Sequence, residues 1–177
     1  AYQVSGKARY AAVARAVLDD LLRRFSLADG GFASSLDSDS DGGEGRYYSW
    51  TEAELRAVLG ADADEFLDAY FDPAYGLVED RATLRLRAGA EQLIAVEARL
   101  ADSRASVLAR RVLRPPPPRD DKMLVPWNAL ALSAFAKAAQ VLDDARYGDV
   151  AVETAETLLG LVGEDGGLVH SRHEPEA

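Results

Sequence analysis

Carboxylates stand close to aromatic residues in two short segments, and these are the residues of the chain most suited to chemistry. The first segment, 37–50, reads DSDSDGGEGRYYSW, and the second, 119–128, reads RDDKMLVPWN. Carboxylic acids can donate or accept a proton, and the apolar face of a sugar packs well on an aromatic ring. The two segments therefore predict a site for a carbohydrate or another small molecule.

The types of these residues indicate their expected roles. The candidate catalytic acids are Asp39, Glu44, Asp120 and Asp121, and the candidate substrate-binding residues are Tyr48, Trp50, Arg119, Lys122, Trp127 and Asn128. Asp120 and Asp121 precede a predicted helix, whose N-terminal dipole favours the ionised form of a base or nucleophile. An acid of the loop 37–44 would then donate the proton, and we expect the two segments to meet at one rim of the helical array.

Each role has a structural alternative that the sequence leaves open. An acidic loop is commonly no more than a solvated loop, and residues such as Trp50 and Trp127 are commonly core anchors. Ion pairs with Arg119 or Lys122 would neutralise the acids and make the arrangement structural.

A calcium site is a rival interpretation of the first segment. Asp37, Asp39, Asp41 and Gly42 fit the first half of an EF-hand loop. The last position of that loop falls on Tyr48, which cannot supply the carboxylate required there. We therefore expect no bound metal and no cofactor.

Composition excludes several classes of protein. The chain has 177 residues, a formal net charge of -10 and no cysteine. The acidic balance disfavours nucleic acids and anionic membranes as partners, and without thiols this chain forms no disulfide and has no thiolate chemistry. No apolar run reaches the length of a membrane span and no signal peptide is visible, so we expect a cytoplasmic protein.

An internal repeat predicts the elements that must position these residues. Residues 1–25 align without a gap on residues 138–162, and after one deletion the Asp-Gly-Gly at 29–31 aligns on the one at 165–167. Each copy contains an amphipathic helix, expected over 9–25 in the first copy, and the glycines that follow stop it. In the second copy the apolar residues 128–142 predict a helix that is buried on all sides.

The repeated unit is therefore a buried inner helix, a turn near 143–144 and a half-exposed outer helix. Such layers are typical of all-α toroids and solenoids. Because the first copy keeps only residues 1–4 of its inner helix, we expect an incomplete toroid with a truncated N-terminus. Apolar surface should then be exposed at its ends, so we expect self-association or marginal stability.

Less regular elements connect the two copies. Segments 32–36 and 46–50 look extended and predict a short β-hairpin around the acidic loop. The TEAE at 51–54 is a capping box for a helix through about Leu59, and further helices are expected at 62–71 and within 89–113. The prolines at 115–118 predict an extended spacer before the inner helix, which begins near Pro126.

The motifs occur in a characteristic order. They are RYAAVARAVLDDLL, DGGFASSLDSDSDGGEGRYYSWT, RDDKMLVPWNALALSAFAKAAQVL, DDARY and DGGLVHS. This order resembles the C-terminal region of YyaL-type thioredoxin-domain-containing proteins, the spermatogenesis-associated thioredoxin-like family, over most of residues 1–172. The resemblance implies an (α/α)6 toroid of the six-hairpin glycosidase and N-acylglucosamine 2-epimerase type, behind an N-terminal thioredoxin-like domain.

On this resemblance, residues 1–177 would be part of one toroid domain, with the thioredoxin-like domain and the remaining hairpins absent from the chain. The family's motif positions fall on Asp37, Asp39, Glu44, Gly45, Tyr48 and Trp50, and on Arg119, Asp120, Asp121, Lys122, Trp127 and Asn128. The chain departs from the family at Ala129, where Gly is usual, at Pro118, where His is usual, and in the stretch 76–90, which is shorter.

Two functions stay open on these grounds. The resemblance implies a carbohydrate-active domain of the hydrolase or epimerase type, although the family's activity is not established. The departures favour instead a non-catalytic helical binding or scaffold module that accompanies a thioredoxin-like domain. A terpene-cyclase-like toroid is disfavoured because only 8% of the residues are aromatic.

Overall fold

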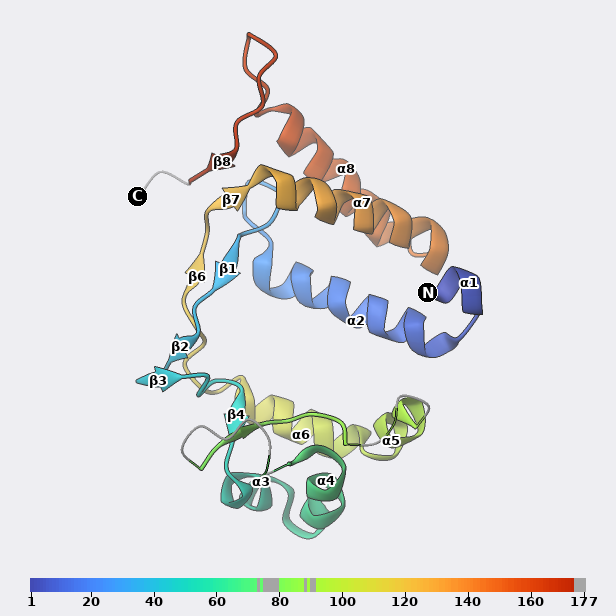
Figure 1. The fold of residues 1–177 in the computed structure, drawn as a ribbon, viewed down its shortest axis with the longest axis vertical. Helices are drawn as coiled ribbons and strands as arrows, with labels where there is room; N and C mark the ends of the chain where they lie inside the picture. Colours follow the sequence, from blue (N-terminus) through green and yellow to red (C-terminus); the bar gives the residue numbers. More distant parts are fainter. Residues whose placement is uncertain (73, 75–79, 88, 90–91, 174–177) are drawn as a thin grey trace. The chain divides into compact units, whose positions relative to one another are not determined.

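The computed structural model of the chain describes residues 1–72, 74, 80–87, 89 and 92–173. The chain divides into two compact units: the repeat unit, residues 1–36 and 119–177, and the insert unit, residues 37–118. Helices predominate in both (Figure 1), and the strands in the described ranges are two-residue antiparallel pairs. The fold is therefore mostly α-helical with short β pairs, as the sequence predicts.

Long helices build the repeat unit. They are α2 (Ala8–Phe25), which follows the short α1 (Tyr2–Ser5), and the hairpin of α7 (Val125–Leu142) and α8 (Ala145–Leu159), visible in Figure 1. The predicted turn between the hairpin helices is confirmed. Asp143 has a left-handed φ of 52° at the end of α7, and the Asp144 carboxylate accepts the N–H of Arg146 at the start of α8. The Arg146 guanidinium also donates to this carboxylate, and that side-chain bond lowers the pKa of Asp144.

The core of the repeat unit lies between α2 and the α7–α8 hairpin. Phe135 is fully buried, and its ring centroid lies 5.3 Å from that of Phe32 and 5.8 Å from that of Tyr147. The Tyr147 hydroxyl donates to the Asp19 carboxylate of α2 over 2.9 Å. Aromatic packing and a polar bridge therefore fix α2 against the hairpin.

The two Asp-Gly-Gly turns share the same hydrogen-bond pattern. A β-bridge joins the ends of each turn, Ser26 to Phe32 in the first copy and Val162 to Leu168 in the second. Just inside each bridge, a backbone N–H donates to the carbonyl four residues further on, over 3.0 Å and 2.8 Å. Because the paired positions keep the offset found after the deletion, the structure confirms the repeat.

The expectation that residues 128–142 are buried on all sides is wrong for one face of α7. Phe135, Ala138 and Leu142 are buried, but Leu130 is 70% exposed. The reason is that α7 packs on α2 and α8, while no other described helix of the repeat unit covers its remaining face. The expected exposure of apolar surface is therefore present.

An apolar groove of about 500 Å³ adds to this exposed surface. It lies between α1, α2 and α7 and is lined by Tyr10, Val13 and Val17 among others. Val13 and Val17 are 48% and 55% exposed. Part of the apolar face of α2 is thus left uncovered.

The insert unit is built from shorter elements. Its helices are α3 (Glu52–Leu59), the 3-10 helix η1 (Gly60–Asp62), α4 (Ala63–Tyr70), α5 (Leu93–Arg99) and α6 (Ala101–Arg111). The predicted capping box is confirmed, because Thr51 Oγ1 accepts the N–H of Glu54 and the Glu54 carboxylate accepts the N–H of Thr51. The prolines at 115–118 belong to no helix. Within the shortened stretch 76–90, residues 76–79, 88 and 90 lie outside the described residues.

The strands pair differently from the predicted hairpin. In the repeat unit β1 (Ser35–Leu36) pairs with β6 (Arg119–Asp120) and β7 (Met123–Leu124) with β8 (Ser171–Arg172). In the insert unit β4 (Ser49–Trp50) pairs with β5 (Ala82–Thr83), so segments 32–36 and 46–50 do not pair with each other. The hairpin lies inside the acidic loop instead, where β2 (Asp39–Ser40) pairs with β3 (Gly43–Glu44).

A local turn signal explains the position of this hairpin. Asp41 and Gly42 have φ values of 52° and 76°. Two successive positive φ angles form the type I′ turn that closes two-residue hairpins, and Asp-Gly is a preferred sequence for it. The Asp41-Gly42 turn therefore determines which residues pair in the hairpin. The β-type composition of the flanking segments does not.

None of the helices in the described ranges combines the length and the apolarity needed to cross a lipid bilayer.

Candidate functional site

The acidic hairpin, residues 39–44, sets two candidate acids side by side. Asp39 is the register partner of Glu44, and both residues are exposed. Side chains that face each other across antiparallel strands have Cβ atoms about 4.5–5.5 Å apart. Like charges in this position destabilise a strand pair. The register therefore places two exposed carboxylates next to each other on one side of the hairpin.

Hydrogen bonds hold the acidic hairpin to its neighbours in the sequence. The Asp37 carboxylate accepts the N–H of Asp39 over 3.0 Å. The buried Ser40 hydroxyl accepts the N–H of Tyr47 over 3.0 Å. The hairpin is thus fixed to the aromatic segment that follows it.

The described part of the chain contains no group of three or more His, Asp or Glu side chains that could hold a metal ion. Asp39, Asp41 and Gly42, which fit a calcium loop by spacing, form a strand and a tight turn. Backbone carbonyls of an EF-hand loop cannot adopt their usual positions in a two-residue hairpin.

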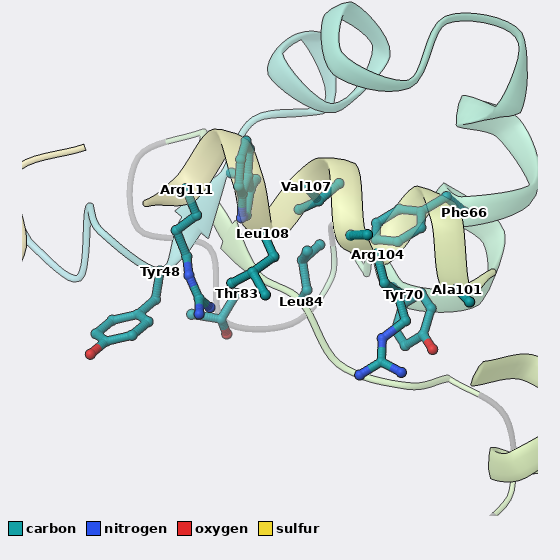
Figure 2. Close-up of a pocket in the computed structure, with 12 residues that line it drawn as sticks. Tyr48, Phe66, Tyr70, Thr83, Leu84, Ala101, Arg104, Val107, Leu108 and Arg111 are labelled. Atoms are coloured by element: carbon teal, nitrogen blue, oxygen red, sulfur yellow. The ribbon is translucent and has the colours of Figure 1, made fainter. Parts of the chain in front are cut away.

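Tyr48 is half-buried and lines a pocket of the insert unit (Figure 2). Its ring stands edge-on to that of Tyr47, with centroids 4.9 Å apart. The Arg111 guanidinium lies 5.7 Å from the centroid of the Tyr48 ring. The aromatic segment is therefore accessible from this pocket as well as close to the acidic hairpin.

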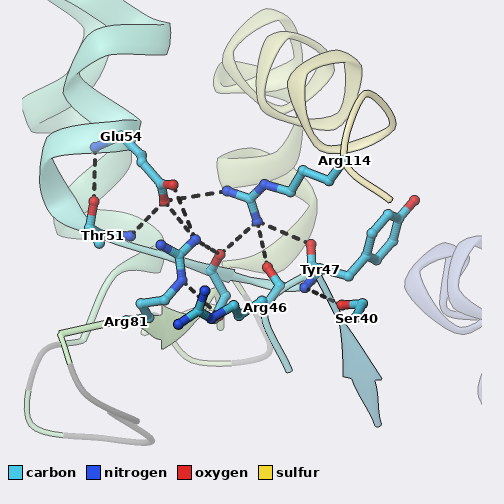
Figure 3. A network of polar contacts seen from close by, with 8 residues as sticks. Ser40, Arg46, Tyr47, Thr51, Glu54, Arg81 and Arg114 are labelled. Carbon is cyan, nitrogen blue, oxygen red and sulfur yellow. Dashed lines mark hydrogen bonds and ion pairs between the residues drawn. The ribbon is translucent and has the colours of Figure 1, made fainter. Parts of the chain in front are cut away.

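A polar network behind the aromatic segment fixes its backbone (Figure 3). Arg114 Nη1 donates to the carbonyls of Arg46, Tyr47 and Ser49, over 2.9, 3.1 and 2.7 Å. Its Nη2 lies 3.3 Å from the Glu54 carboxylate. One guanidinium thus ties the segment between β3 and β4 to the start of α3.

Trp50 lies beneath the same guanidinium. The centroid of its ring is 3.9 Å from the Arg114 guanidinium carbon, and the residue is 2% exposed. Burial lowers the pKa of Arg114, while the Glu54 carboxylate acts in the opposite direction. Arg81 completes the cluster through a 2.8 Å ion pair with Glu54. Trp50 is therefore a core residue, as the structural alternative for it predicts.

The second candidate segment lies in the repeat unit and is held there by Arg119. Arg119 forms an ion pair with Asp121. Its Nη1 also donates to the carbonyls of Arg24 and Ser26, each over 3.1 Å. Arg119 therefore neutralises the Asp121 carboxylate and joins it to the end of α2, as the structural alternative for this segment predicts.

Asp120 is exposed and has a different environment. Its carboxylate accepts the N–H of the half-buried Lys122 over 3.1 Å, and its carbonyl accepts the N–H of Ser34 over 3.2 Å. Within the described residues no ion pair engages this carboxylate. Asp120 is thus more available than Asp121 to an incoming molecule.

Trp127 and Asn128 are adjacent in the first turn of α7 but differ in environment. Trp127 is 56% exposed, whereas Asn128 is 2% exposed. The Asn128 amide accepts the N–H of Phe32 and donates to the carbonyls of Phe32 and Leu124, over 2.7, 3.0 and 3.1 Å. A Cβ on Gly31 would lie 2.9 Å from Asn128 Oδ1, so only glycine fits beside this clamp. Asn128 therefore positions the first Asp-Gly-Gly turn, and Trp127 offers an open aromatic face.

The structure brings candidate residues together within each unit. Asp39 faces Glu44 in the insert unit, and Arg119 contacts Asp121 in the repeat unit. Because the two segments belong to different units, their meeting at one rim stays a prediction. Sequence reasoning missed Arg114, whose contacts lie 60 to 68 residues away in the chain and leave no local pattern.

Comparison with known proteins shows similarity between this chain and one part of several longer proteins. No protein-family model matches the chain. The chain is 31% identical over 192 residues to human spermatogenesis-associated protein 20, an alignment that covers 89% of this chain and 24% of that protein. The mouse protein of that name is 31% identical over 176 residues, with 80% and 22% covered. An uncharacterized protein of Caenorhabditis elegans is 24% identical over 190 residues, with 88% and 26% covered.

The chain spans about a quarter of the length of these curated relatives. Over most of its own length it is thus similar to one part of spermatogenesis-associated protein 20, which supports the family that its motifs indicate.

Proposed function

We propose that the chain is part of a carbohydrate-active α/α toroid of the hydrolase or epimerase type. The observation that carries this proposal is the register of the acidic hairpin, which sets the exposed carboxylates of Asp39 and Glu44 opposite each other. Retaining glycosidases hold their two carboxyl groups about 5–5.5 Å apart. Cross-strand neighbours have Cβ atoms about 4.5–5.5 Å apart, so two carboxyl groups in this register can reach that separation.

The remaining roles follow from accessibility. One hairpin carboxyl donates a proton to the leaving oxygen, and its hairpin partner acts as base or nucleophile. The half-buried ring of Tyr48, which follows the acidic hairpin in the same unit, would carry the apolar face of a sugar ring. The repeated helix with its Asp-Gly-Gly turn supports the toroid, and the similarity to spermatogenesis-associated protein 20 supports its family. A thioredoxin-like domain in the intact protein and a cytoplasmic location are parts of the same proposal.

The proposal predicts which acids matter in the intact natural protein. Asp39→Asn and Glu44→Gln are each expected to lower kcat/KM about 100-fold or more, because general acid–base groups contribute on this order. The measurement is a screen with aryl glycosides and N-acylated amino sugars, followed by kinetics on any substrate that turns over. Asp41→Asn is the matched control, because it removes the same charge from the same hairpin at a position where Asn tolerates the positive φ. Activity that survives both acid substitutions, or no turnover of any sugar, would refute the proposal.

A non-catalytic binding or scaffold module is the second candidate, and the Arg119–Asp121 ion pair favours it. In this alternative the charges of segment 119–122 hold β6 against the end of α2 through the carbonyls of Arg24 and Ser26. Substrate turnover that Asp121→Asn abolishes, with the fold intact by circular dichroism, would exclude it.

We also propose that the chain self-associates through the apolar groove between α1, α2 and α7. Val17 is 55% exposed in the middle of this groove. Sedimentation velocity at several concentrations is expected to show a mass that rises with concentration, and Val17→Asp should restore the monomer. Val152→Asp, at a 59% exposed position of α8 outside the groove, is the control and should leave the association unchanged. A monodisperse wild-type monomer would contradict this proposal.

A further inference from the structure

The pocket of the insert unit lies between α4, α6 and the β4–β5 pair and has a volume of about 590 Å³ (Figure 2). Trp50, Phe66 and Leu108 give it apolar walls. Concave sites of this size, with apolar walls and a few polar groups, are typical of small-molecule binding. Asp39 and Glu44 do not line it, so the pocket is distinct from the acidic hairpin.

Two arginines of α6 extend along this pocket. Arg104, Leu108 and Arg111 recur at helical spacing, which places them on one face of α6. At the rise of an α-helix, the Cα atoms of the two arginines are about 10 Å apart. Figure 2 shows both side chains on the same side of α6, with Leu108 between them. Positive charge therefore stands at both ends of an apolar strip.

The charge of Arg104 is partly neutralised and that of Arg111 is not. Arg104 pairs with Glu97 over 3.0 Å. Among the described residues no carboxylate pairs with Arg111, which lies over the rings of Tyr47 and Tyr48 at 5.5 and 5.7 Å. Its Nε is buried and finds no acceptor in the described part of the chain.

Tyr70 supplies a second donor in the lining. The residue is 8% exposed, and its hydroxyl is buried without a hydrogen-bond partner in the described ranges. Burial raises the pKa of this hydroxyl, while the positive charge of Arg104 acts in the opposite direction. The hydroxyl therefore stays protonated at neutral pH and can donate. Buried polar groups without partners are rare in native proteins, and each calls for an explanation such as a missing ligand.

We propose that this pocket binds an elongated organic anion: a flat aromatic body with a carboxylate or phosphate at one end and a hydrogen-bond acceptor at the other. Arg111 binds the anionic end, and Tyr70 and Arg104 bind the acceptor. The aromatic body packs against Leu84 and Leu108, the accessible apolar side chains of the lining. Because Arg111 is only partly buried, a turn of its side chain brings Nε to the ligand. This site does not depend on the carbohydrate proposal, since it uses neither hairpin acid.

Calorimetric titration of the complete 177-residue chain tests the site. The probes are 4-nitrophenyl phosphate and 4-nitrobenzoate, which distinguish a phosphate from a carboxylate at the Arg111 end. Saturable binding of at least one probe is expected, with affinity about tenfold or more above that of 4-nitrobenzyl alcohol or inorganic phosphate, because charge-assisted hydrogen bonds are the strong ones.

Variants assign the binding to the named residues. Arg111→Gln is expected to lower the affinity for the probe about tenfold, and Arg111→Lys should keep part of that affinity. Arg110→Gln is the matched control, since it removes the same charge from an exposed neighbouring position of α6 outside this pocket. Tyr70→Phe should weaken binding severalfold and also raise the melting temperature, because it deletes a buried hydroxyl that has no partner.

Three results would overturn the site. They are the absence of saturable binding for both probes, an equal loss in Arg110→Gln and Arg111→Gln, and a lowered melting temperature in Tyr70→Phe. The second would show a general effect of charge, and the third would show that the Tyr70 hydroxyl already has a partner.

Discussion

Replacement of Arg114 by alanine is expected to lower the free energy of unfolding of the insert unit by about 2–3 kcal/mol. The Arg114 side chain is 13% exposed and donates to three backbone carbonyls (Figure 3). Its removal leaves the carbonyls of Arg46 and Tyr47 without this donor and uncovers the face of Trp50, whereas Arg81 still donates to Glu54 and to the Ser49 carbonyl. Acceptors that lose their donor and a core ring that loses its cover are among the larger effects of single substitutions.

Fluorescence can follow this loss in the insert unit alone. The chain has two tryptophans, so Trp50 is the only reporter in a Trp127→Phe background, which changes an exposed position. Urea denaturation of Arg114→Ala in this background should give the predicted shift. Arg110→Ala, an exposed position on the same unit, should change stability by less than about 0.5 kcal/mol. Arg114→Lys should recover only part of the loss, because an ammonium cannot donate to three carbonyls and also stack on an indole. An Arg114→Ala protein as stable as its parent would show that the network is dispensable.

The helices were predictable because their signals are local. The spacing of apolar residues indicates α2 and α8, and the TEAE sequence at 51–54 indicates the start of α3. The repeat added information, because the second copy shows which helix precedes an Asp-Gly-Gly turn. These features depend on residues within a few turns of one another, so a single sequence contains them.

The strand pairs were not predictable because each strand has two residues and a distant partner. β1 pairs with β6 across more than eighty residues, and two residues show no alternation of apolar and polar side chains. The Asp41-Gly42 turn is the exception, since Asp-Gly marks a type I′ hairpin locally. It places Asp39 opposite Glu44, a contact that turn chemistry alone predicts.

Candidate site residues of the same type differ in burial, and the sequence does not show this difference. Trp50 and Trp127 are the same residue in similar acidic surroundings, yet one is covered by Arg114 and the other is open. Asn128 stands in a motif beside Trp127, yet its amide is engaged by Phe32, 96 residues earlier in the chain. These differences follow from long-range packing, which no spacing within the motifs records.

Phe135→Ala is expected to lower the free energy of unfolding of the repeat unit by about 3–5 kcal/mol. Phe135 is 0% exposed, and its ring lies parallel to that of Phe32, with an interplanar angle of 3°. It also contacts Tyr147, so one truncation leaves a cavity between α2, α7 and α8. The cost includes the lost burial of the ring and the poor ability of two fixed aromatic neighbours to fill the space.

Urea denaturation followed by circular dichroism measures this loss, and native-state hydrogen exchange assigns it to the amides of α7 and α8. Leu130→Ala is the control on the same helix, because Leu130 is 70% exposed and its truncation should cost less than about 0.5 kcal/mol. Phe135→Leu should cost less than Phe135→Ala, since it keeps part of the buried volume. Leu130→Ala could also lose as much stability as Phe135→Ala, but only at high protein concentration. That result would place the open face of α7 in an interface between associated chains. An equally large loss at every concentration would show that this face is covered within the chain itself, and would contradict the exposure of Leu130.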